Sequence, residues 1–289
     1  MVSPNSFPID VTPENNIKNA FRNNEAQYLM TYELHPEVSF PNRQDEDNKP
    51  VLVLLHGYGG SGMVFFKILA ELHQRYKVYM VDLMGMGRSA RPPFEADSPE
   101  EAEDFFINSL EHWRQKLDLT EFILAGHSFG GYISAWYTLW HYEHVTKLLL
   151  LSPHGVVQRI EGAPTIEERF REQGWKGRMK VNFYNYFIVK KQLTPFSVLW
   201  GMGWGLAPYF FKRYMNRAMW DLQGEDFEIV REYIYQSCLQ EGSGEYALTK
   251  LFEEVIYAKN PVLWDIQELA SKVDVAFFYG SRDWMNLRI

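Results

Sequence analysis

The sequence predicts an α/β fold, in which helices cover both faces of a mostly parallel, doubly wound sheet and a helical cap follows the sixth strand. Two observations carry this prediction. Between residues 51 and 151, short apolar segments alternate with segments of helical periodicity. After Pro153 the chain becomes helical, aromatic and irregular, and a last apolar strand segment returns only at residues 273–279.

The N-terminal part contains the first predicted strands. Residues 1–25 are polar and rich in asparagine, which indicates a loose arm. Residues 27–34 and 38–40 are predicted to form two short antiparallel strands. The continuous apolar segment 51–55 predicts a strand that is buried on both faces, as in a parallel sheet with helices above and below it.

The following elements alternate. Helices are predicted at residues 64–74, 100–117 and 130–142, and strands at residues 77–83, 122–125 and 147–151. Ser98 and Pro99 suit the N-cap and the first position of the second of these helices. The predicted organisation is an N-terminal arm with the first strands at 1–50, a core at 51–154, a cap at 155–265 and a continuation of the core at 266–289.

Composition narrows the class of protein. Of the 289 residues, 46% are hydrophobic, as expected of a folded globular chain. The net charge of −8 argues against nucleic acid as a partner, because that function requires clustered lysine and arginine. A single cysteine, Cys238, excludes an internal disulfide, and we see neither a secretory signal nor an apolar segment long enough to span a membrane. We therefore expect a soluble, cytoplasmic protein.

The strongest functional motif follows the strand predicted at 122–125. Gly126-His127-Ser128-Phe129-Gly130 is a G-x-S-x-G pattern between a strand and a helix, which is typical of the α/β-hydrolase fold. The glycines remove Cβ atoms that would collide in so sharp a turn. Ser128 is therefore the predicted catalytic nucleophile. A Gly-Ser turn without chemistry is the alternative, and the flanking strand and helix argue against it.

A second glycine-rich turn, His56-Gly57-Tyr58-Gly59-Gly60, follows the strand at 51–55. This is the expected place of the oxyanion loop. Backbone N–H groups of Tyr58, with Gly59 as second choice, and of Phe129 would bind the negative oxygen of a tetrahedral intermediate. His56 is expected to brace the loop by a hydrogen bond rather than to act as a base. The alternative is a turn that serves packing alone.

A third turn runs from Asp82 to Ser89. It lacks the third glycine and the βαβ context of a dinucleotide-binding motif, so we interpret it as a structural turn whose backbone is capped by Asp82. No cofactor is implied, and no group of residues has the spacing of metal ligands.

Asp283 follows the strand at 273–279, where this fold carries the acid of a Ser–acid–His triad. It would hold the histidine tautomer and stabilise the imidazolium, although an ordinary turn aspartate is the alternative. The sequence has no histidine after His154, which precedes the acid and so has the wrong order for this fold. We expect the sequence to be truncated, without its general base, an edge strand and a final helix.

The chain resembles the abhydrolase-domain four/five group of α/β hydrolases, which are lysophospholipase-like and lysophosphatidate-acyltransferase-like proteins. The resemblance runs from about Pro50 to Asn286. It is carried by the two glycine-rich motifs and by Leu151-Ser-Pro-His-Gly155, Thr194-Pro-Phe-Ser197, Met202-Gly-Trp-Gly205, Tyr233-Ile-Tyr-Gln236 and Asp283-Trp-Met-Asn286. It implies a serine hydrolase acting on lipid carboxylic esters of the lysophospholipid or acylglycerol type, or acyl transfer to lysophosphatidate. It also implies peripheral association with membranes or lipid droplets.

The resemblance implies a second hypothesis as well. Some members of the group lack the nucleophile and act as lipase co-activators, whereas Ser128 matches the catalytic members. The C-terminal His-x-x-x-x-Asp element of the family is absent from this sequence. A non-catalytic lipid-surface protein, or a partner of a lipase, is therefore the alternative function.

The cap supports a lipid ligand on physical grounds. Residues 196–211 are rich in aromatic side chains, Trp200 and Trp204 among them, but glycines and Pro208 interrupt them too often for a membrane span. They could line an acyl pocket or contact a lipid interface, with Lys212, Arg213 and Arg217 near the headgroups. The alternative, that the aromatic residues form the core of the cap, suits most of them.

Overall fold

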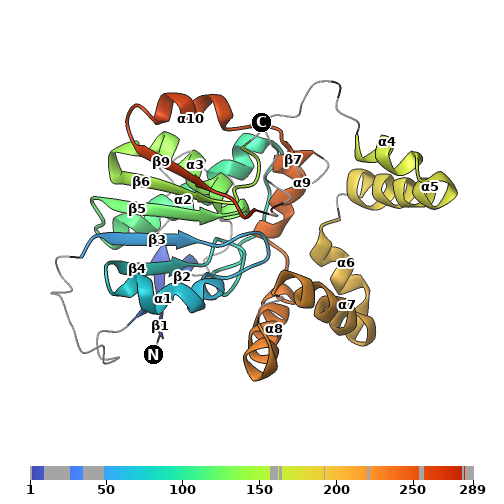
Figure 1. Ribbon diagram of the computed structural model, residues 1–289, viewed down its shortest axis with the longest axis horizontal. Helices are drawn as coiled ribbons and strands as arrows, with labels where there is room; N and C mark the ends of the chain where they lie inside the picture. Colours follow the sequence, from blue (N-terminus) through green and yellow to red (C-terminus); the bar gives the residue numbers. More distant parts are fainter. Residues whose placement is uncertain are drawn as a thin grey trace.

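The computed structural model describes residues 2–9, 27–34, 49–156, 162, 165–191, 193–219, 222–253, 257–281 and 283 (Figure 1). Its centre is a seven-stranded sheet in the order β1-β2-β4-β3-β5-β6-β9. The strands are β1 (Val2–Ile9), β2 (Gln27–Leu34), β3 (Val51–Leu55), β4 (Lys77–Val81), β5 (Phe122–His127), β6 (Val145–Leu151) and β9 (Asp274–Phe278). The strand β2 is antiparallel to both of its neighbours, and the pairs from β4 to β9 are parallel. The predicted mostly parallel, doubly wound sheet is confirmed.

The N-terminus differs from the expected loose arm. Val2–Ile9 forms β1 and pairs antiparallel with β2 over its whole length. A second strand satisfies backbone groups that β2 would otherwise present unpaired at the sheet edge. Backbone pairing needs no apolar side chains, so composition misled the prediction for residues 2–9, and residues 10–25 lie outside the described residues. The strand predicted at 38–40 lies outside the described residues.

Helices lie on both faces of the sheet. One face carries the short 3₁₀ segment η2 (Gly62–Phe65) and α1 (Phe66–His73). The other carries α2 (Pro99–Lys116), α3 (Phe129–Trp140), α9 (Ala247–Leu251) and α10 (Leu263–Leu269). A one-turn 3₁₀ segment, η3 (Tyr142–His144), follows α3. The start of α2 is as predicted, because the Ser98 side chain accepts a hydrogen bond from the N–H of Glu101 and Pro99 is the first helical residue.

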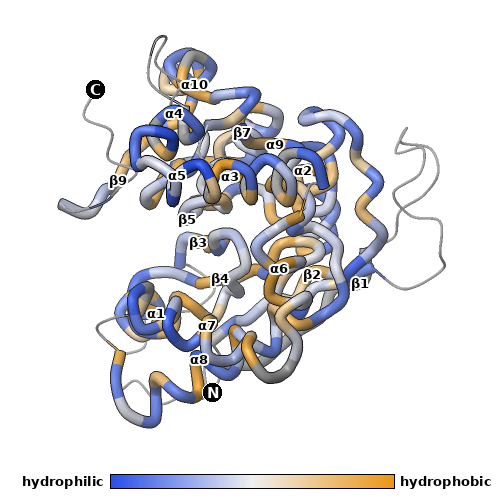
Figure 2. The backbone as a smooth tube through the Cα atoms, turned by 90° about the vertical axis from the view of Figure 1, so that its right-hand side faces the viewer, coloured by the Kyte–Doolittle hydropathy of each residue, from blue (hydrophilic) through white to orange (hydrophobic). Residues whose placement is uncertain are grey.

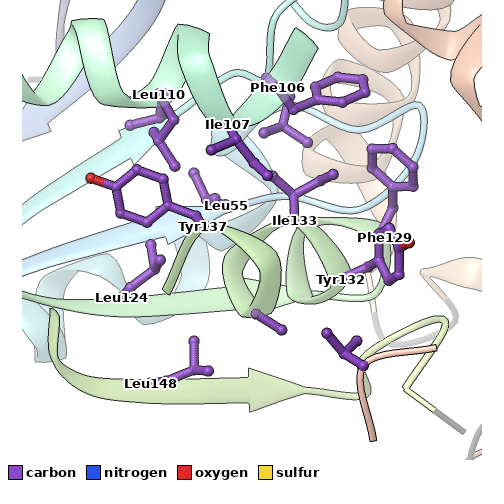
Figure 3. Close-up of a cluster of buried hydrophobic side chains, with 14 of the residues drawn as sticks. Leu55, Phe106, Ile107, Leu110, Leu124, Phe129, Tyr132, Ile133, Tyr137 and Leu148 are labelled. Atoms are coloured by element: carbon purple, nitrogen blue, oxygen red, sulfur yellow. The ribbon is translucent and has the colours of Figure 1, made fainter. Parts of the chain in front are cut away.

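The strand β3 shows why its sequence is apolar throughout. Leu52 and Leu54 pack into the cluster beneath α1, whereas Val53 and Leu55 pack into the larger cluster beneath α2 and α3. Figure 3 shows this larger cluster, in which side chains of α2 meet those of α3 over the sheet. Both faces of β3 are buried, as the sequence predicted.

The chain between β6 and β9 contains the cap. Its helices are α4 (Ile166–Arg171), α5 (Gly174–Phe183), the π-helix η4 (Tyr184–Lys190), α6 (Pro195–Gly201), α7 (Gly203–Ala218) and α8 (Gly224–Cys238). The carboxyl ends of the parallel strands point toward α6 and α7 (Figure 1). The helices α6, α7 and α8 share a buried apolar cluster, but no residue of α4, α5 or η4 belongs to any such cluster of described residues. The cap faces the viewer in Figure 2.

The end of this insertion packs on the core. After the 3₁₀ turn η5 (Gly244–Tyr246), side chains of α9, of the small hairpin β7 (Phe252–Glu253) and β8 (Tyr257–Ala258), and of α10 join the larger core cluster. The division between cap and core at residue 265 stays a prediction. None of the described helices combines the length and the apolar character that crossing a bilayer requires.

Candidate active site

Ser128 lies between β5 and α3, at the carboxyl edge of the sheet. Its backbone has φ 55° and ψ −118°, a conformation that non-glycine residues rarely adopt. Its N–H donates to the carbonyl of Leu151 at 3.0 Å, and its carbonyl accepts from the N–H groups of Gly131 at 2.9 Å and His154 at 3.0 Å. The strand–turn–helix geometry expected around Ser128 is therefore present. We call this turn, residues 126–130, the elbow.

Two glycines permit this turn. A Cβ atom on Gly126 would overlap the carbonyl oxygen of Gly130, and a Cβ atom on Gly130 would overlap the carbonyl oxygen of His56. Because only hydrogen fits at both positions, α3 packs directly on the ends of β5 and β3. The Ser128 side chain is left half-buried at the sheet edge.

The loop after β3 lies beside Ser128. A Cβ atom on Gly57 would be 3.1 Å from the Cβ of Ser128. The ring of Tyr58 stacks on Phe196 of α6, with centroids 5.1 Å apart, and meets Phe129 edge-on at 6.2 Å. Gly59 has φ +68°, and any Cβ there would overlap the Phe196 ring. The loop is thus held between α3 and the cap.

Two backbone N–H groups are available beside Ser128. In the part of the chain that the structure describes, the N–H groups of Tyr58 and Phe129 have no hydrogen-bond acceptor. Phe129 is the first residue of α3, where N–H groups lack intrahelical partners and the helix dipole is positive. Such donors suit a developing oxyanion. Their assignment as the oxyanion hole stays a prediction.

His56 braces the loop. Its Nε2 accepts the N–H of Leu83 at 3.0 Å, so Nδ1 carries the proton and donates to the Gly57 carbonyl at 2.7 Å. Burial lowers the pKa of His56, which favours this neutral form. The expected structural role of His56 is confirmed.

Asp82 joins three parts of the site. Its buried carboxylate accepts hydrogen bonds from the hydroxyl of Ser61 at 2.8 Å, from the N–H of Gly62 at 2.6 Å and from the N–H of Arg88 at 2.8 Å. The hydroxyl of Tyr32 donates to the same group at 3.1 Å. The predicted backbone cap of the 82–89 turn is confirmed, and the carboxylate also fixes the segment that follows the oxyanion loop.

Asp283 reaches the same edge of the sheet as Ser128. In the parallel register, Leu151 of β6 lies opposite both His127 of β5 and Phe278 of β9, so these strands end level. The N–H of Asp283 donates to the carbonyl of Gly280 at 3.1 Å. Burial and the neighbouring His56 lower the pKa of His127, whereas Asp283 opposes this change. The structure thus brings Asp283 near the elbow, and its role in a triad stays a prediction.

His154, whose order relative to Asp283 is wrong for a base in this fold, has structural contacts. Its ring is buried and stacks on Phe252, with centroids 4.2 Å apart and 8° between the planes. Its backbone N–H supports the elbow through the Ser128 carbonyl. These contacts indicate that His154 holds the elbow in place.

A cavity of about 490 Å³ opens beside the oxyanion loop. It is bounded by residues 57–60, by His127 and by apolar residues of the cap, among them Phe196, Leu199, Phe210, Met215 and Ile234. Burial raises the pKa of the Cys238 thiol in its wall to about 12, so this group is neutral. Of the lining residues from α7 and α8, only Ile234 lies in a stretch that carries the family resemblance, and the sequence signal of the others is the aromatic and apolar character of the cap.

The aromatic segment of the cap divides between two environments. Phe211 is buried in the cap core, and the indole of Trp200 donates to the Cys238 carbonyl at 2.9 Å. Tyr209 and Phe210 are exposed instead. The side chain of Trp204 lies outside the described residues. Core packing thus accounts for part of the segment, whereas the alternative interpretation expected it to account for most of these aromatic residues.

Comparison with known proteins now identifies the family. A family profile described as "alpha/beta hydrolase fold" matches residues 50–203, more than half of the chain. The chain belongs to the α/β hydrolases. A crystal structure of a membrane phospholipase A shares the fold, with a TM-score of 0.60 at 17% identity over 98% of this chain and 71% of that chain.

Curated relatives place this α/β hydrolase in the expected group. It is 37% identical to a probable 1-acylglycerol-3-phosphate O-acyltransferase of Oryza sativa subsp. japonica, over 83% of this chain and 58% of that protein. It is 30% identical to the (lyso)-N-acylphosphatidylethanolamine lipase of Homo sapiens, over 92% of this chain and 78% of that protein. The resemblance to the abhydrolase-domain four/five group is confirmed. The chain spans 58% and 60% of the length of its plant relatives.

In this α/β hydrolase the cap is fastened to the loops of the core. The hydroxyl of Tyr233 on α8 lies 3.0 Å from the Ser61 hydroxyl and 2.7 Å from that of Tyr32. The guanidinium of Arg91 donates to the carbonyls of Ser237 at 3.1 Å and Glu241 at 2.9 Å. Movement of α8 would therefore reach the oxyanion loop through hydrogen bonds.

A buried carboxyl group ties α2 to the elbow helix. The hydroxyl of Tyr132, one turn after Ser128, donates to Glu103, and the amide of Asn260 lies 3.4 Å from the same oxygen. Burial outweighs these hydrogen bonds and raises the pKa of Glu103 from 4.5 to about 7. Between these two values the unfolded chain releases a proton that the folded chain retains, so the free energy of unfolding falls as the pH rises.

Glu103→Gln is expected to remove this pH dependence, because glutamine stays neutral and can still accept the Tyr132 hydrogen bond. The free energy of unfolding of the variant minus that of the wild type should rise by roughly 1–2 kcal/mol from about pH 5 to about pH 8. Urea denaturation of both proteins at the two pH values measures the difference. Glu121→Gln, at an exposed position, is the control. An equal pH dependence in wild type and Glu103→Gln would contradict the assignment.

Proposed function

We propose that this α/β hydrolase is a serine hydrolase that cleaves carboxylic esters of lipids, of the lysophospholipid or acylglycerol type. The observation that carries the proposal is the juxtaposition of Ser128, in its strained turn, with two available backbone N–H groups, next to residues 57–60 and His127 that border a largely apolar cavity. A cavity lined by apolar side chains suits an acyl chain. The names of the curated relatives, acyltransferase and lipase, support a lipid substrate.

In the proposed reaction the Ser128 oxygen attacks the ester carbonyl, and the N–H groups of Tyr58 and Phe129 bind the resulting oxyanion. Collapse of this intermediate breaks the ester C–O bond, and the alcohol leaves with the proton that the Ser128 hydroxyl lost. Water then releases the fatty acid from the acyl-enzyme, whereas lysophosphatidate as acceptor would give acyl transfer. Asp283 would orient the histidine that carries the proton, and no histidine of residues 1–289 is assigned to this role.

Substrate profiling tests the proposal. The protein is incubated with a lysophosphatidylcholine, with a monoacylglycerol, and with lysophosphatidate plus an acyl donor, and products are identified by mass spectrometry. A fluorophosphonate probe is expected to label Ser128, and fatty acid release from at least one ester should accompany labelling. Labelling of another serine, or no turnover of any of these lipids, would contradict the proposal.

The second candidate is a non-catalytic lipid-surface protein or lipase co-activator. The observation that favours it is that His56 and His154 both have structural contacts. Under this proposal the protein would work at a membrane or lipid-droplet surface with a lipase as partner. A purified lipase whose rate rises equally with wild type and with Ser128→Ala would favour it over the catalytic proposal.

A further inference from the structure

The helix α5 buries its small side chains. Gly177 and Val181 are buried, and a Cβ atom on Gly177 would overlap the carbonyl oxygen of Phe170 in α4. The two helices therefore approach each other across a face that offers little apolar area. The large side chains of α5 therefore lie on the face of the helix that points away from α4.

The large apolar side chains of α5 and η4 are exposed. Trp175 and Met179 are 63% and 62% exposed, and Phe183 and Tyr186 are 52% and 48% exposed. Intervals of four residues put Trp175, Met179 and Phe183 on one face of α5, and the exposed Tyr186 follows three residues later in the π-helix η4. We call these four residues the α5 stripe. Soluble proteins bury most residues of this kind, so four exposed ones within one short stretch of chain indicate an interaction surface.

Basic side chains accompany the α5 stripe. The Lys176 ammonium lies 5.7 Å from the ring centre of Trp175, and those of Lys190 and Lys191 each lie 6.0 Å from that of Tyr186. Residues 174–220 contain eight lysine and arginine residues and no aspartate or glutamate, in a chain whose net charge is −8. Lys212 pairs with Glu228 of α8 at 2.8 Å, and the positive charge of the other basic residues indicates an anionic partner.

The exposed face of α7 has the same apolar character and adjoins the cavity. Leu206, Tyr209, Phe210 and Tyr214 are all exposed. Phe210 and Tyr214 also line the cavity beside His127. An acyl chain that leaves a lipid layer in contact with α7 would therefore meet the cavity directly.

We propose that the α5 stripe and the exposed face of α7 bind the surface of a phospholipid bilayer with anionic headgroups. The aromatic and aliphatic side chains would enter the boundary between headgroups and acyl chains, and the lysines and arginines would meet the phosphates. The basic residues favour an anionic surface as the occupant, because they accompany both exposed faces: Lys176, Lys190 and Lys191 lie near the α5 stripe, and Arg213 and Arg217 belong to α7. The inference rests on the lipid substrate class proposed above, but not on the chemistry of Ser128.

Vesicle co-sedimentation tests the apolar contribution. The protein is mixed with vesicles of phosphatidylcholine and with vesicles of phosphatidylcholine and phosphatidylserine. We expect binding to the anionic vesicles, weakened about tenfold or more in the double variant Trp175→Ala/Met179→Ala. Trp140→Ala is the matched control, because Trp140 is 64% exposed but lies at the end of α3. Its binding should equal that of the wild type.

A charge variant tests the electrostatic contribution. Lys190→Gln/Lys191→Gln should bind anionic vesicles about tenfold more weakly and leave binding to phosphatidylcholine unchanged. All the replaced side chains are exposed, so circular dichroism and thermal melting should match the wild type. Equal vesicle binding by wild type and both double variants would overturn the inference. Loss of self-association in Trp175→Ala/Met179→Ala, with vesicle binding intact, would assign the stripe to a protein interface instead.

Ser128→Ala separates this inference from the proposed function, since it should bind vesicles as the wild type does. Vesicle binding by a protein that turns over no ester would reject the catalytic proposal and leave the docking surface standing. Ester turnover by a protein that does not bind vesicles would reject the docking surface and leave the catalytic proposal standing.

Discussion

In a full-length form that contains the triad histidine, Ser128→Ala is expected to lower the rate of lipid ester hydrolysis about 10³-fold or more, because the proposed nucleophile is removed while the N–H donors remain. Stability should hardly change. Alanine keeps the backbone at φ 55°, and the elbow is held by backbone hydrogen bonds rather than by the hydroxyl. The measurement is turnover of the best substrate from the profiling, with thermal unfolding recorded on the same samples.

Ser128→Gly makes this test sharper. It should abolish turnover equally, but glycine adopts a positive φ without strain, so the melting temperature is expected to equal or exceed that of Ser128→Ala. Ser271→Ala, at an exposed position after α10, is the control for replacement of a serine. Ester turnover by Ser128→Ala within tenfold of the wild type would reject Ser128 as the nucleophile.

Asp82→Ala is expected to cause the largest loss of stability, about 3 kcal/mol or more. The replacement leaves the N–H groups of Gly62 and Arg88 and the hydroxyls of Ser61 and Tyr32 without their acceptor in a buried site. The stability of Asp82→Asn should lie between those of Asp82→Ala and the wild type, because the amide oxygen of asparagine can accept from only some of these donors. Urea denaturation gives the free energy of unfolding for each variant.

A matched exposed aspartate calibrates this comparison. The Asp97 side chain is 94% exposed and lies 3.5 Å from Lys250, and Asp97→Ala should change stability by about 0.5 kcal/mol or less. If Asp82→Ala unfolded within about 1 kcal/mol of Asp97→Ala, the view of Asp82 as the shared acceptor of the loops would be wrong.

The Asp82 network also extends to the cap. Tyr233 of α8 meets the same Ser61 and Tyr32 hydroxyls that donate to Asp82. Removal of the carboxylate is therefore expected to shift both the oxyanion loop and the position of α8 against the core. Loss of activity in Asp82 variants would report this coupling and not a chemical role of Asp82.

The motifs could be located from the sequence because their physics is local. The turn at Ser128 needs glycines at fixed offsets, and an all-apolar strand such as Val51–Leu55 needs helices on both faces, so neighbouring residues suffice to predict them. The cap of the 82–89 turn by Asp82 and the start of α2 at Ser98 are local for the same reason. Strand β1 was missed because its partner supplies backbone groups, which leave no pattern in the side chains.

By itself, the sequence determined the α/β fold, the elbow at Ser128 and the likeness to the abhydrolase-domain four/five group, because each depends on residues that are close in the chain. Only the tertiary structure decided which distant residues share the site. Parallel register brings Asp283 to the edge that carries Ser128, and α7 and α8 close an apolar cavity over the loop. The tertiary structure also places the large side chains of α5 outward, because the tight packing at Gly177 leaves them no room against α4. Such placements follow from long-range packing, which no local pattern encodes.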